Sequence, residues 1–258
     1  MRLFTPGSRV DVDIDPADHP EARRRGPRAR PRGAVALAVG AVAVAGGLAL
    51  GAMAVPRLLA AIELGDSRSI AERAELRDES LTDHQIDDAA LALERSLDWN
   101  ADADLAALLA AARLGQAARP TQAPLVEKRL AQAEAAARRA IAASPAHPTA
   151  WALLALAIDA RDPDDPALPR VLERALAVAP FDPRYLEQRI EVACRLWHRV
   201  DDRTRATAAE QIRMFAGRDL DRLAAIAKRT FGLLPVRESL APAPDLLRRF
   251  DSIYIRLP

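Results

Sequence analysis

The feature that most constrains this chain is an uncharged stretch near its N-terminus, "GAVALAVGAVAVAGGLALGAMAV" from Gly33 to Val55. At about 1.5 Å per residue, a helix of this length exceeds the roughly 30 Å hydrocarbon core of a lipid bilayer. A long apolar run without charges is typical of a membrane-spanning segment. The sequence therefore predicts one transmembrane helix, to which we assign residues 33–62.

Arginine residues on one side of this stretch predict its orientation. The segment "RRRGPRARPR", Arg23–Arg32, lies directly before it, whereas the following residues mix Arg57 with acidic residues such as Glu63. Basic residues concentrate on the cytoplasmic side of membrane spans. We therefore expect residues 1–32 to form a disordered, Arg-rich cytoplasmic tail. The C-terminal part would be periplasmic, on a single-pass protein of the bacterial inner membrane.

A cleaved signal peptide is the alternative interpretation of the apolar stretch, with Ala52–Ala54 as its small-residue cleavage site. Signal peptides have a short charged start and an apolar core of about 7 to 15 residues. Here the segment before the apolar run is far longer than such a start, and the run itself exceeds that core length. We therefore favour a retained anchor in the lipid of the inner membrane.

Small residues recur at four-residue spacing inside the predicted anchor, at Ala43, Gly47 and Gly51. This spacing places small side chains on one face of a helix, where two backbones can approach closely in lipid. We predict that these three residues form a helix-packing face. Through this face the chain could form a homo-oligomer.

The composition of the remaining chain favours helices. Half of all residues are hydrophobic, yet only 4% are aromatic, and alanine and leucine supply the difference. These residues lose little side-chain freedom in a helix, so the sequence predicts an all-α fold. The formal net charge is +1. Because so small a charge produces no strong field for a polyanion, we expect no nucleic-acid partner.

Helix-start signals divide the chain beyond the anchor. Ser69 followed by Glu72, and Thr82 followed by Gln85, both have the spacing of a capping box. We assign residues 63–81 to a linker helix and residues 82–200 to helical repeats. Residues 201–258 form a C-terminal helical cap of three short helices, and its last residues, "DSIYIRLP", are expected to pack as a tail.

Two pairs of prolines with the same spacing interrupt the repeat region. The segment "AIAASPAHPTAW" contains Pro145 and Pro148, and "LAVAPFDPRYL" contains Pro180 and Pro183. The first proline of each pair ends a helix because it has no backbone N–H to donate. The second suits the first turn of the next helix. Each pair therefore predicts a tight turn between antiparallel helices.

A shift of 35 residues superposes the two proline pairs and defines a unit that resembles the tetratricopeptide repeat, a helix-turn-helix unit of 34 residues. The start of the family pattern, W-x2-L-G-x2-Y, corresponds to Trp151, Leu154, Ala155 and Ile158. Its A-x3-F step corresponds to Ala167 and Val171, and its end to Ala175 and Pro180. Alanine replaces the glycine, isoleucine replaces the tyrosine, and one residue is inserted. The resemblance is good over about residues 133–190 and loose over 82–132. It implies an α-solenoid of TPR-like helical hairpins whose neighbours stack.

The same resemblance implies where a protein partner binds, because the first helix of each pair lines the concave face of such stacks. The predicted concave-face residues are Thr149, Ala152, Leu156, Arg184, Glu187 and Glu191. A face that is small and apolar in one unit and charged in the next suits a protein segment with an apolar anchor and a nearby charge. Alternatively, the charged residues are solvated and form i,i+4 pairs on the helix surface.

The sequence contains none of the common catalytic or metal-binding motifs, so we expect no enzyme activity, cofactor or metal site. The overall layout resembles that of small membrane-anchored repeat proteins associated with bacterial exopolysaccharide or surface-polysaccharide biosynthesis. That resemblance implies a scaffold that binds membrane or periplasmic proteins of an envelope assembly complex. The alternatives are an adaptor for secretion, cytochrome maturation or cell-wall assembly, and a direct carbohydrate-binding protein.

The arginine asymmetry makes a testable prediction about topology. Alkaline phosphatase fused after Pro258 should be active, because the enzyme would be exported with the C-terminal part of the chain. The measurement is phosphatase activity in intact cells. An inactive phosphatase, together with an active cytoplasmic reporter fused at the same point, would contradict the predicted orientation.

Overall fold

The computed structural model describes residues 32–76, 78–180 and 182–257, with side chains from Leu37 onward. All regular secondary structure in these residues is α-helical, which confirms the predicted all-α class. The helices are α1 (Arg32–Leu64), α2 (Ser67–Glu75), α3 (Asp83–Trp99), α4 (Ala103–Ala117), α5 (Ala123–Ala143), α6 (Pro148–Arg161), α7 (Leu168–Val178), α8 (Leu186–Leu196), α9 (Asp202–Ala216), α10 (Leu220–Thr230), α11 (Leu233–Leu240) and α12 (Pro244–Arg256). The chain divides into two compact units, Met1–Gly51 and Ala52–Pro258, and the boundary lies within α1.

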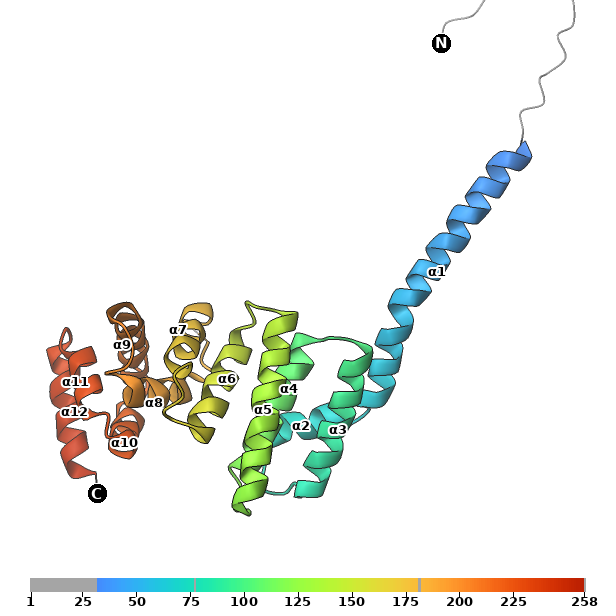
Figure 1. Ribbon diagram of the computed structural model, residues 1–258. Coiled ribbons are helices and arrows are strands. Elements are labelled where there is room, and N and C mark those ends of the chain that lie inside the picture. Colours follow the sequence, from blue (N-terminus) through green and yellow to red (C-terminus); the bar gives the residue numbers. More distant parts are fainter. Residues whose placement is uncertain (1–31, 77, 181, 258) are drawn as a thin grey trace, which may run out of the picture. The chain divides into compact units, whose positions relative to one another are not determined.

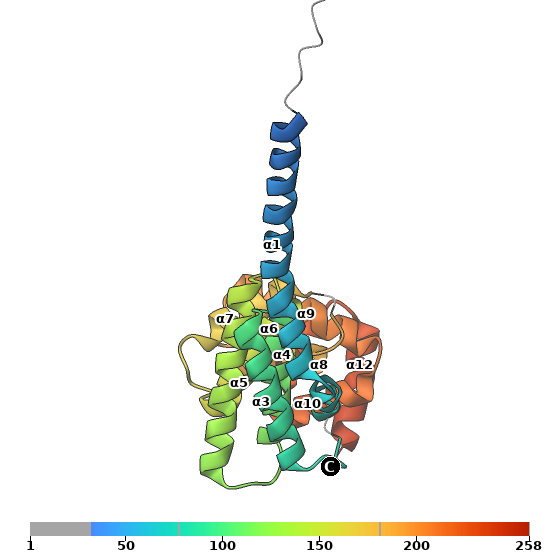
Figure 2. The same ribbon diagram turned by 90° about the vertical axis from the view of Figure 1, so that its right-hand side faces the viewer.

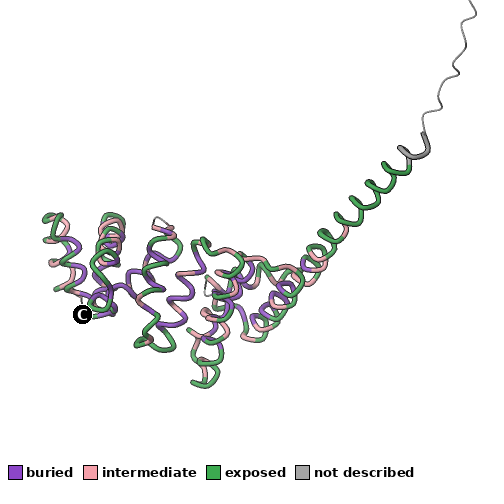
Figure 3. The backbone as a smooth tube through the Cα atoms, turned by 45° about the horizontal axis from the view of Figure 1, so that its top comes forward, coloured by how far each residue is buried: buried purple, intermediate pink, exposed green. Residues whose placement is uncertain are grey.

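Helix α1 contains the predicted membrane span. Its part from Leu37 to Leu64 is long and apolar enough to cross a bilayer, and among the described helices it alone meets that test. Its large apolar side chains are exposed, as at Leu48 and Leu50, each with 70% of its surface accessible. Figure 3 shows this exposure along most of the helix. A helix with such a surface is suited to the apolar interior of a bilayer. Of the predicted tail at residues 1–32, only Arg32 lies within the described part of the chain.

The end of α1 is joined directly to the packed unit. Gly65 has a positive φ of 40°, which glycine adopts readily, and with Asp66 it connects α1 to α2. Asp66 occupies the N-cap position of α2, and the Ser69 hydroxyl donates a 2.8 Å hydrogen bond to its carbonyl oxygen. The prediction that Ser69 caps a helix is therefore wrong. Helix α2 is also no mere linker, because Ala71 is fully buried against its neighbours.

Helix α3 begins as the sequence predicts. The Thr82 hydroxyl accepts a hydrogen bond from the Gln85 backbone N–H, and the Gln85 side chain accepts one from the Thr82 N–H at 2.8 Å. This arrangement is a complete capping box. Further along the helix, Leu93 and Leu97 lie on one buried stripe. The capping signal thus fixes the start of α3, and its apolar period fixes which face turns inward.

Within the second unit, the helices form a row in chain order (Figure 1). In the view turned by 90°, the row is seen from one end, so that its helices overlap (Figure 2). Each even-numbered helix from α2 to α10 packs on the helix that follows it and on the next even-numbered helix. The even-numbered helices α2, α4, α6, α8, α10 and α12 therefore touch one another in sequence. They line one continuous face of the unit.

The two proline pairs produce related turns that differ in detail. Pro148 occupies the first turn of α6, as predicted, and His147 caps the helix by accepting the Ala150 backbone N–H. Pro183, in contrast, lies before α8, which starts at Leu186. Asp182 explains the difference, since its side chain accepts the backbone N–H of Arg184 and its carbonyl oxygen accepts a bond from buried Arg189. These bonds hold an additional turn ahead of the helix.

The C-terminal region contains four helices where the sequence predicted three. Phe231 ends α10 in a left-handed conformation, with φ of 54°, and Gly232 then opens the short helix α11. The expected tail "DSIYIRLP" is helical as far as Arg256 and belongs to α12. Phe250 anchors α12 because it is fully buried. Packing of this helix on α10 overrides the short alternating pattern at Ile253 and Ile255.

The close contact between α2 and α4 makes a testable prediction. A Cβ added at Gly115 would lie 2.5 Å from the carbonyl oxygen of Ala74, so Gly115→Ala must force the two helices apart. We expect it to lower the free energy of unfolding by about 1–3 kcal/mol. Gly217→Ala is the matched control, because its Cβ would meet nothing closer than 3.6 Å and its φ is −67°. That change should be neutral or stabilise by up to about 1 kcal/mol.

Thermal unfolding of the full chain in detergent, followed by circular dichroism, measures both effects. Equal melting temperatures for Gly115→Ala and the unaltered protein would contradict the close packing of α2 on α4.

Candidate functional site

The face lined by the even-numbered helices carries two adjoining cavities. The first, here called the polar pocket, has a volume of about 490 Å³ and lies among α2, α4 and the residues at the starts of α6 and α8. The second, the apolar groove, has a volume of about 310 Å³ and lies among the end of α2, α4, α5, α6 and α8. Both cavities are lined by Glu75, Ala111 and Tyr185. These three residues therefore form the boundary between them.

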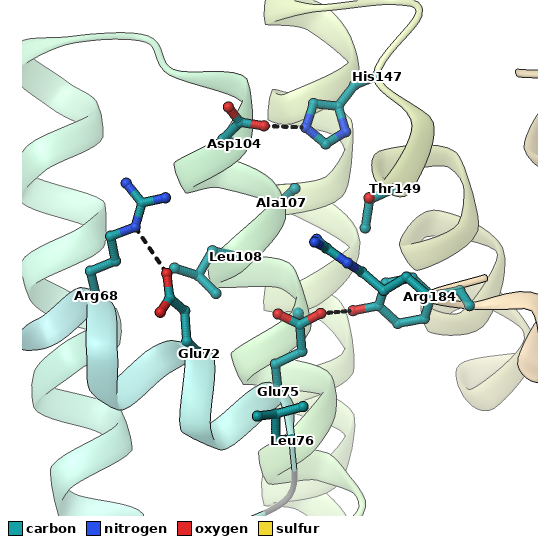
Figure 4. A pocket seen from close by; sticks show the side chains of 12 residues that line it. Arg68, Glu72, Glu75, Leu76, Asp104, Ala107, Leu108, His147, Thr149 and Arg184 are labelled. Carbon is teal, nitrogen blue, oxygen red and sulfur yellow. Dashed lines mark hydrogen bonds and ion pairs between the residues drawn. The ribbon is translucent and has the colours of Figure 1, made fainter. Parts of the chain in front are cut away.

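Charged side chains surround the polar pocket (Figure 4). The Nε of Arg68 lies 3.0 Å from an oxygen of Glu72 one turn away on α2. Arg184 lies across the pocket from this pair, and no carboxylate among the described residues forms an ion pair with its guanidinium. The pocket thus presents both signs of charge, with Arg184 as its unpaired cation.

His147 links the turn before α6 to the first turn of α4. Its Nδ1 accepts the Ala150 backbone N–H at 3.2 Å, and its Nε2 lies 2.9 Å from an oxygen of Asp104. Because Nδ1 acts as an acceptor, the ring proton belongs on Nε2, which donates to Asp104. This arrangement orients the imidazole at the edge of the polar pocket. The histidine therefore fixes the position of two helix starts.

The apolar groove has a hydrocarbon floor. Leucine and valine side chains from three helices supply it, namely Leu114, Val126, Leu130, Leu153 and Leu156. Leu153 and Leu130 are buried beneath the surface, whereas Leu114, Val126 and Leu156 are half-buried. Alanines of α4 and α6 complete the walls. Such a surface favours apolar side chains of a ligand, because their burial removes hydrocarbon from water.

The charged residues that line the groove are all acidic: Glu75, Asp159 and Glu191. Asp159 is paired with Arg195, whose Nε lies 3.2 Å from its Oδ1. Glu191 is paired with Arg229 of α10. Glu75 has no ion pair with any described cation. Its carboxylate instead accepts a 2.7 Å hydrogen bond from the hydroxyl of Tyr185.

Tyr185 is a suitable donor for this bond. Its side chain is buried, and burial is the larger cause that raises its pKa, with the hydrogen bond to Glu75 as the second cause. The phenol therefore keeps its proton throughout the physiological range. A neutral hydroxyl orients the Glu75 carboxylate but carries no charge to offset that of the carboxylate, and no cation among the described residues pairs with it.

The predicted binding residues on α6 have different positions. Thr149 is buried and lines the polar pocket, and half-buried Leu156 lines the apolar groove. Ala152 is fully buried, so it contributes to the core and offers no surface to a partner. The reason is that α6 is covered on several sides, by α4, α5, α7 and α8. A concave-face assignment from sequence alone does not distinguish these positions.

The predicted residues near α8 all border cavities, but their partners differ from those expected. Arg184 lines the polar pocket and Glu191 lines the apolar groove. Glu187 lines a third cavity, and its Oε2 lies 2.6 Å from the Nε of Arg222. The alternative prediction of i,i+4 pairs is wrong, since Glu187 and Glu191 pair with arginines of α10. These ion pairs tie two even-numbered helices together.

The predicted packing face in the membrane helix lies on α1. A Cβ added at Gly47 or Gly51 would meet no other atom within 4 Å, so both positions are open to a second helix. Whether Ala43, Gly47 and Gly51 contact another chain stays a prediction.

The single cysteine is unsuited to nucleophilic chemistry. Cys194 is buried, and this burial raises the pKa of its thiol to about 12, with the hydrogen bond to Thr230 acting in the opposite direction. A thiol with so high a pKa contains almost no thiolate at neutral pH. Its role is to fill space beside Gly232, where a Cβ would lie 2.8 Å from the Cβ of Cys194.

Sequence reasoning missed Glu75 and Tyr185, which form the boundary of the two cavities. It assigned the segment of Glu75 to a linker helix and gave Tyr185 no role. A signal was present in the small residues Ala71 and Ala74 on α2 and Gly115 on α4, which permit close helix contact. Their meeting depends on tertiary packing, which the local pattern does not specify.

Comparison with known protein families, with curated proteins and with solved structures finds no match to this chain. The interpretation of the two cavities therefore depends on their own geometry.

The bond between Tyr185 and Glu75 makes a prediction about stability. Tyr185→Phe removes the hydroxyl that joins α2 to the start of α8 and should lower the free energy of unfolding by about 1–3 kcal/mol. Tyr254→Phe is the matched control, because the Tyr254 hydroxyl makes no hydrogen bond to a described residue, and it should change stability by less than about 0.5 kcal/mol. Thermal unfolding of the two full-length variants tests the difference. Identical melting curves would show that this bond contributes nothing to stability.

Proposed function

We propose that the chain is a membrane-anchored helical-repeat adaptor that binds a segment of another protein. The observation that carries this proposal is the consecutive contact of the even-numbered helices, which line one face bearing the polar pocket and the apolar groove. Proteins built from stacked helix pairs use such faces as extended binding surfaces. The face offers two neighbouring chemistries to one ligand.

The packing order supports a tetratricopeptide-like arrangement of helix pairs. The pairs would be α2/α3, α4/α5, α6/α7, α8/α9 and α10/α11, with α12 as the terminal cap. Each pair is short, and the core extends from one pair to the next along the unit. Helix pairs that cannot bury their apolar faces alone are expected to stack in this way.

A protein segment fits this face better than a small molecule. Small-molecule sites are usually enclosed cavities with a few convergent polar groups. Here two cavities adjoin, and their linings come from five helices. An extended or helical segment can occupy both at once. The partner would then place apolar side chains in the groove and polar groups in the pocket.

The anchor supports a partner in or near the membrane. Only Gly65 and Asp66 separate α1 from α2, whose residues line both cavities. With the orientation that the arginines predict, the binding face is periplasmic and the partner belongs to a bacterial envelope assembly complex. Exopolysaccharide or surface-polysaccharide biosynthesis is the pathway we propose, supported by the overall layout of anchor and repeats. Loss of the polymer on deletion of the gene would test that pathway.

Site-specific photo-crosslinking in living cells tests the adaptor function. A photoreactive phenylalanine at position 160 lies at the exposed edge of the apolar groove, whereas one at position 135 lies on the exposed surface of α5, away from the described cavities. We expect position 160 to give a discrete crosslinked protein in the membrane fraction that position 135 does not give. Identical adducts at both positions, or none at 160, would contradict binding in the groove.

A blocking variant makes this test specific. Ala160→Arg places a long side chain over the groove at an exposed position, and Ala135→Arg makes the same change on α5. With the crosslinker at position 118, another exposed residue of the groove, Ala160→Arg should abolish the adduct and Ala135→Arg should leave it unchanged.

A further inference from the structure

We propose that the apolar groove selects a protein segment with a basic side chain beside its apolar anchors, and that Glu75 is the residue that receives this cation. This inference rests on the proposed function and deepens it, because it names the charge of the partner and the residue that recognises it. Glu75 comes from α2, directly after the membrane helix, and stands where the apolar groove meets the polar pocket.

Charge complementarity supports a cation as the ligand group. Among the described residues, those that line the apolar groove include three carboxylates and no arginine, lysine or histidine. Two of these carboxylates, on Asp159 and Glu191, already have arginine partners within the chain. Glu75 is the rim carboxylate that lacks one among the described residues. It is therefore the position at which a ligand can supply the missing positive charge.

The geometry of Glu75 suits this role. Its Oε1 accepts the Tyr185 hydroxyl at 2.7 Å, while its Oε2 accepts no hydrogen bond from a described residue. Tyr185 holds the carboxylate in one orientation, so less side-chain freedom is lost when a cation binds. The carboxylate is half-buried, and in such a position an ion pair with a guanidinium or ammonium group is stronger than on an open surface.

Neither of the two described arginines of the polar pocket forms an ion pair with Glu75. Arg68 is engaged by Glu72, which lies one turn before Glu75 on α2. Arg184 lies on the polar-pocket side of Tyr185 and forms no ion pair with Glu75. Arg184 could instead meet an acidic group of the same ligand. A segment with apolar side chains, a basic residue and then an acidic or polar residue would complement both cavities.

An anionic ligand is disfavoured in the groove. An acidic side chain there would approach Glu75 without any free cation among the groove residues to offset the repulsion. A wholly apolar segment would fill the floor at Leu114 and Leu156 but leave Glu75 partly desolvated and unpaired. The basic segment is the occupant that both satisfies the carboxylate and fills the floor.

Selection from a displayed library of random twelve-residue peptides tests the inference. The full chain in lipid nanodiscs is the target, and peptides that still bind Ala160→Arg are removed, so the retained peptides require the open groove. We expect these peptides to be enriched in lysine or arginine next to leucine, isoleucine, valine or phenylalanine. Glu75→Gln should weaken their binding at least tenfold, because the amide keeps the acceptor for Tyr185 but carries no charge.

Glu173→Gln is the matched control, since it removes an exposed carboxylate of α7 that lines neither the apolar groove nor the polar pocket, and it should change affinity less than twofold. A second measurement does not depend on the fold of any variant. Replacing the basic residue of an enriched peptide by glutamine should weaken binding to the unaltered chain as much as Glu75→Gln does. The two changes together should weaken peptide binding no more than either change alone, because both remove the same ion pair.

The outcomes separate this inference from the proposed function. Groove-dependent peptides without basic residues, or with equal affinity for the Glu75→Gln chain, would overturn the role of Glu75 while the groove remains a protein-binding site. Failure to enrich any groove-dependent peptide would overturn both proposals.

Discussion

The close packing of α2 on α4 is the contact on which the binding face depends. Glycine at position 115 lets the backbone of Ala74 approach α4 more closely than any side chain would permit. That approach places Glu75 beside Tyr185, a residue 110 positions later in the chain. Without it, α2 would close neither cavity. One glycine and two alanines thus make α2, the short helix after α1, a wall of the site.

Charge is distributed unevenly over this face. Most ion pairs near the cavities join successive even-numbered helices or adjacent turns of one helix, as Glu191 with Arg229 and Arg68 with Glu72 illustrate. Pairs of this kind are partly exposed and contribute little stability each. Their effect on the site is greater than their effect on the fold, because they neutralise charge at some positions and leave Glu75 and Arg184 without an ion pair among the described residues.

Much of the fold could be predicted because its signals are local. A charge-free run predicts α1, the Thr82 capping box predicts the start of α3, and Pro148 predicts the first turn of α6. The failures share one cause, which is that long-range packing decides them. Burial of Ala152 requires neighbours on several sides, and the ion pairs of α8 require α10. Likewise, the hydrogen bond between Glu75 and Tyr185 joins residues far apart in the chain and leaves no periodic pattern, so sequence reasoning did not predict it.

The two-residue joint between α1 and α2 also has a mechanical consequence. Glu63 on the last turn of α1 is paired with Arg95 of α3 at 3.1 Å, and Leu64 packs against the core, so the end of the anchor is fastened on one side. Gly65 and Asp66 then lead directly into the wall of the groove. A connection of two residues permits little independent movement of the helices that it joins. A displacement of the last turn of α1 would therefore be absorbed at Gly65 or be transmitted as strain to the helix that carries Glu75.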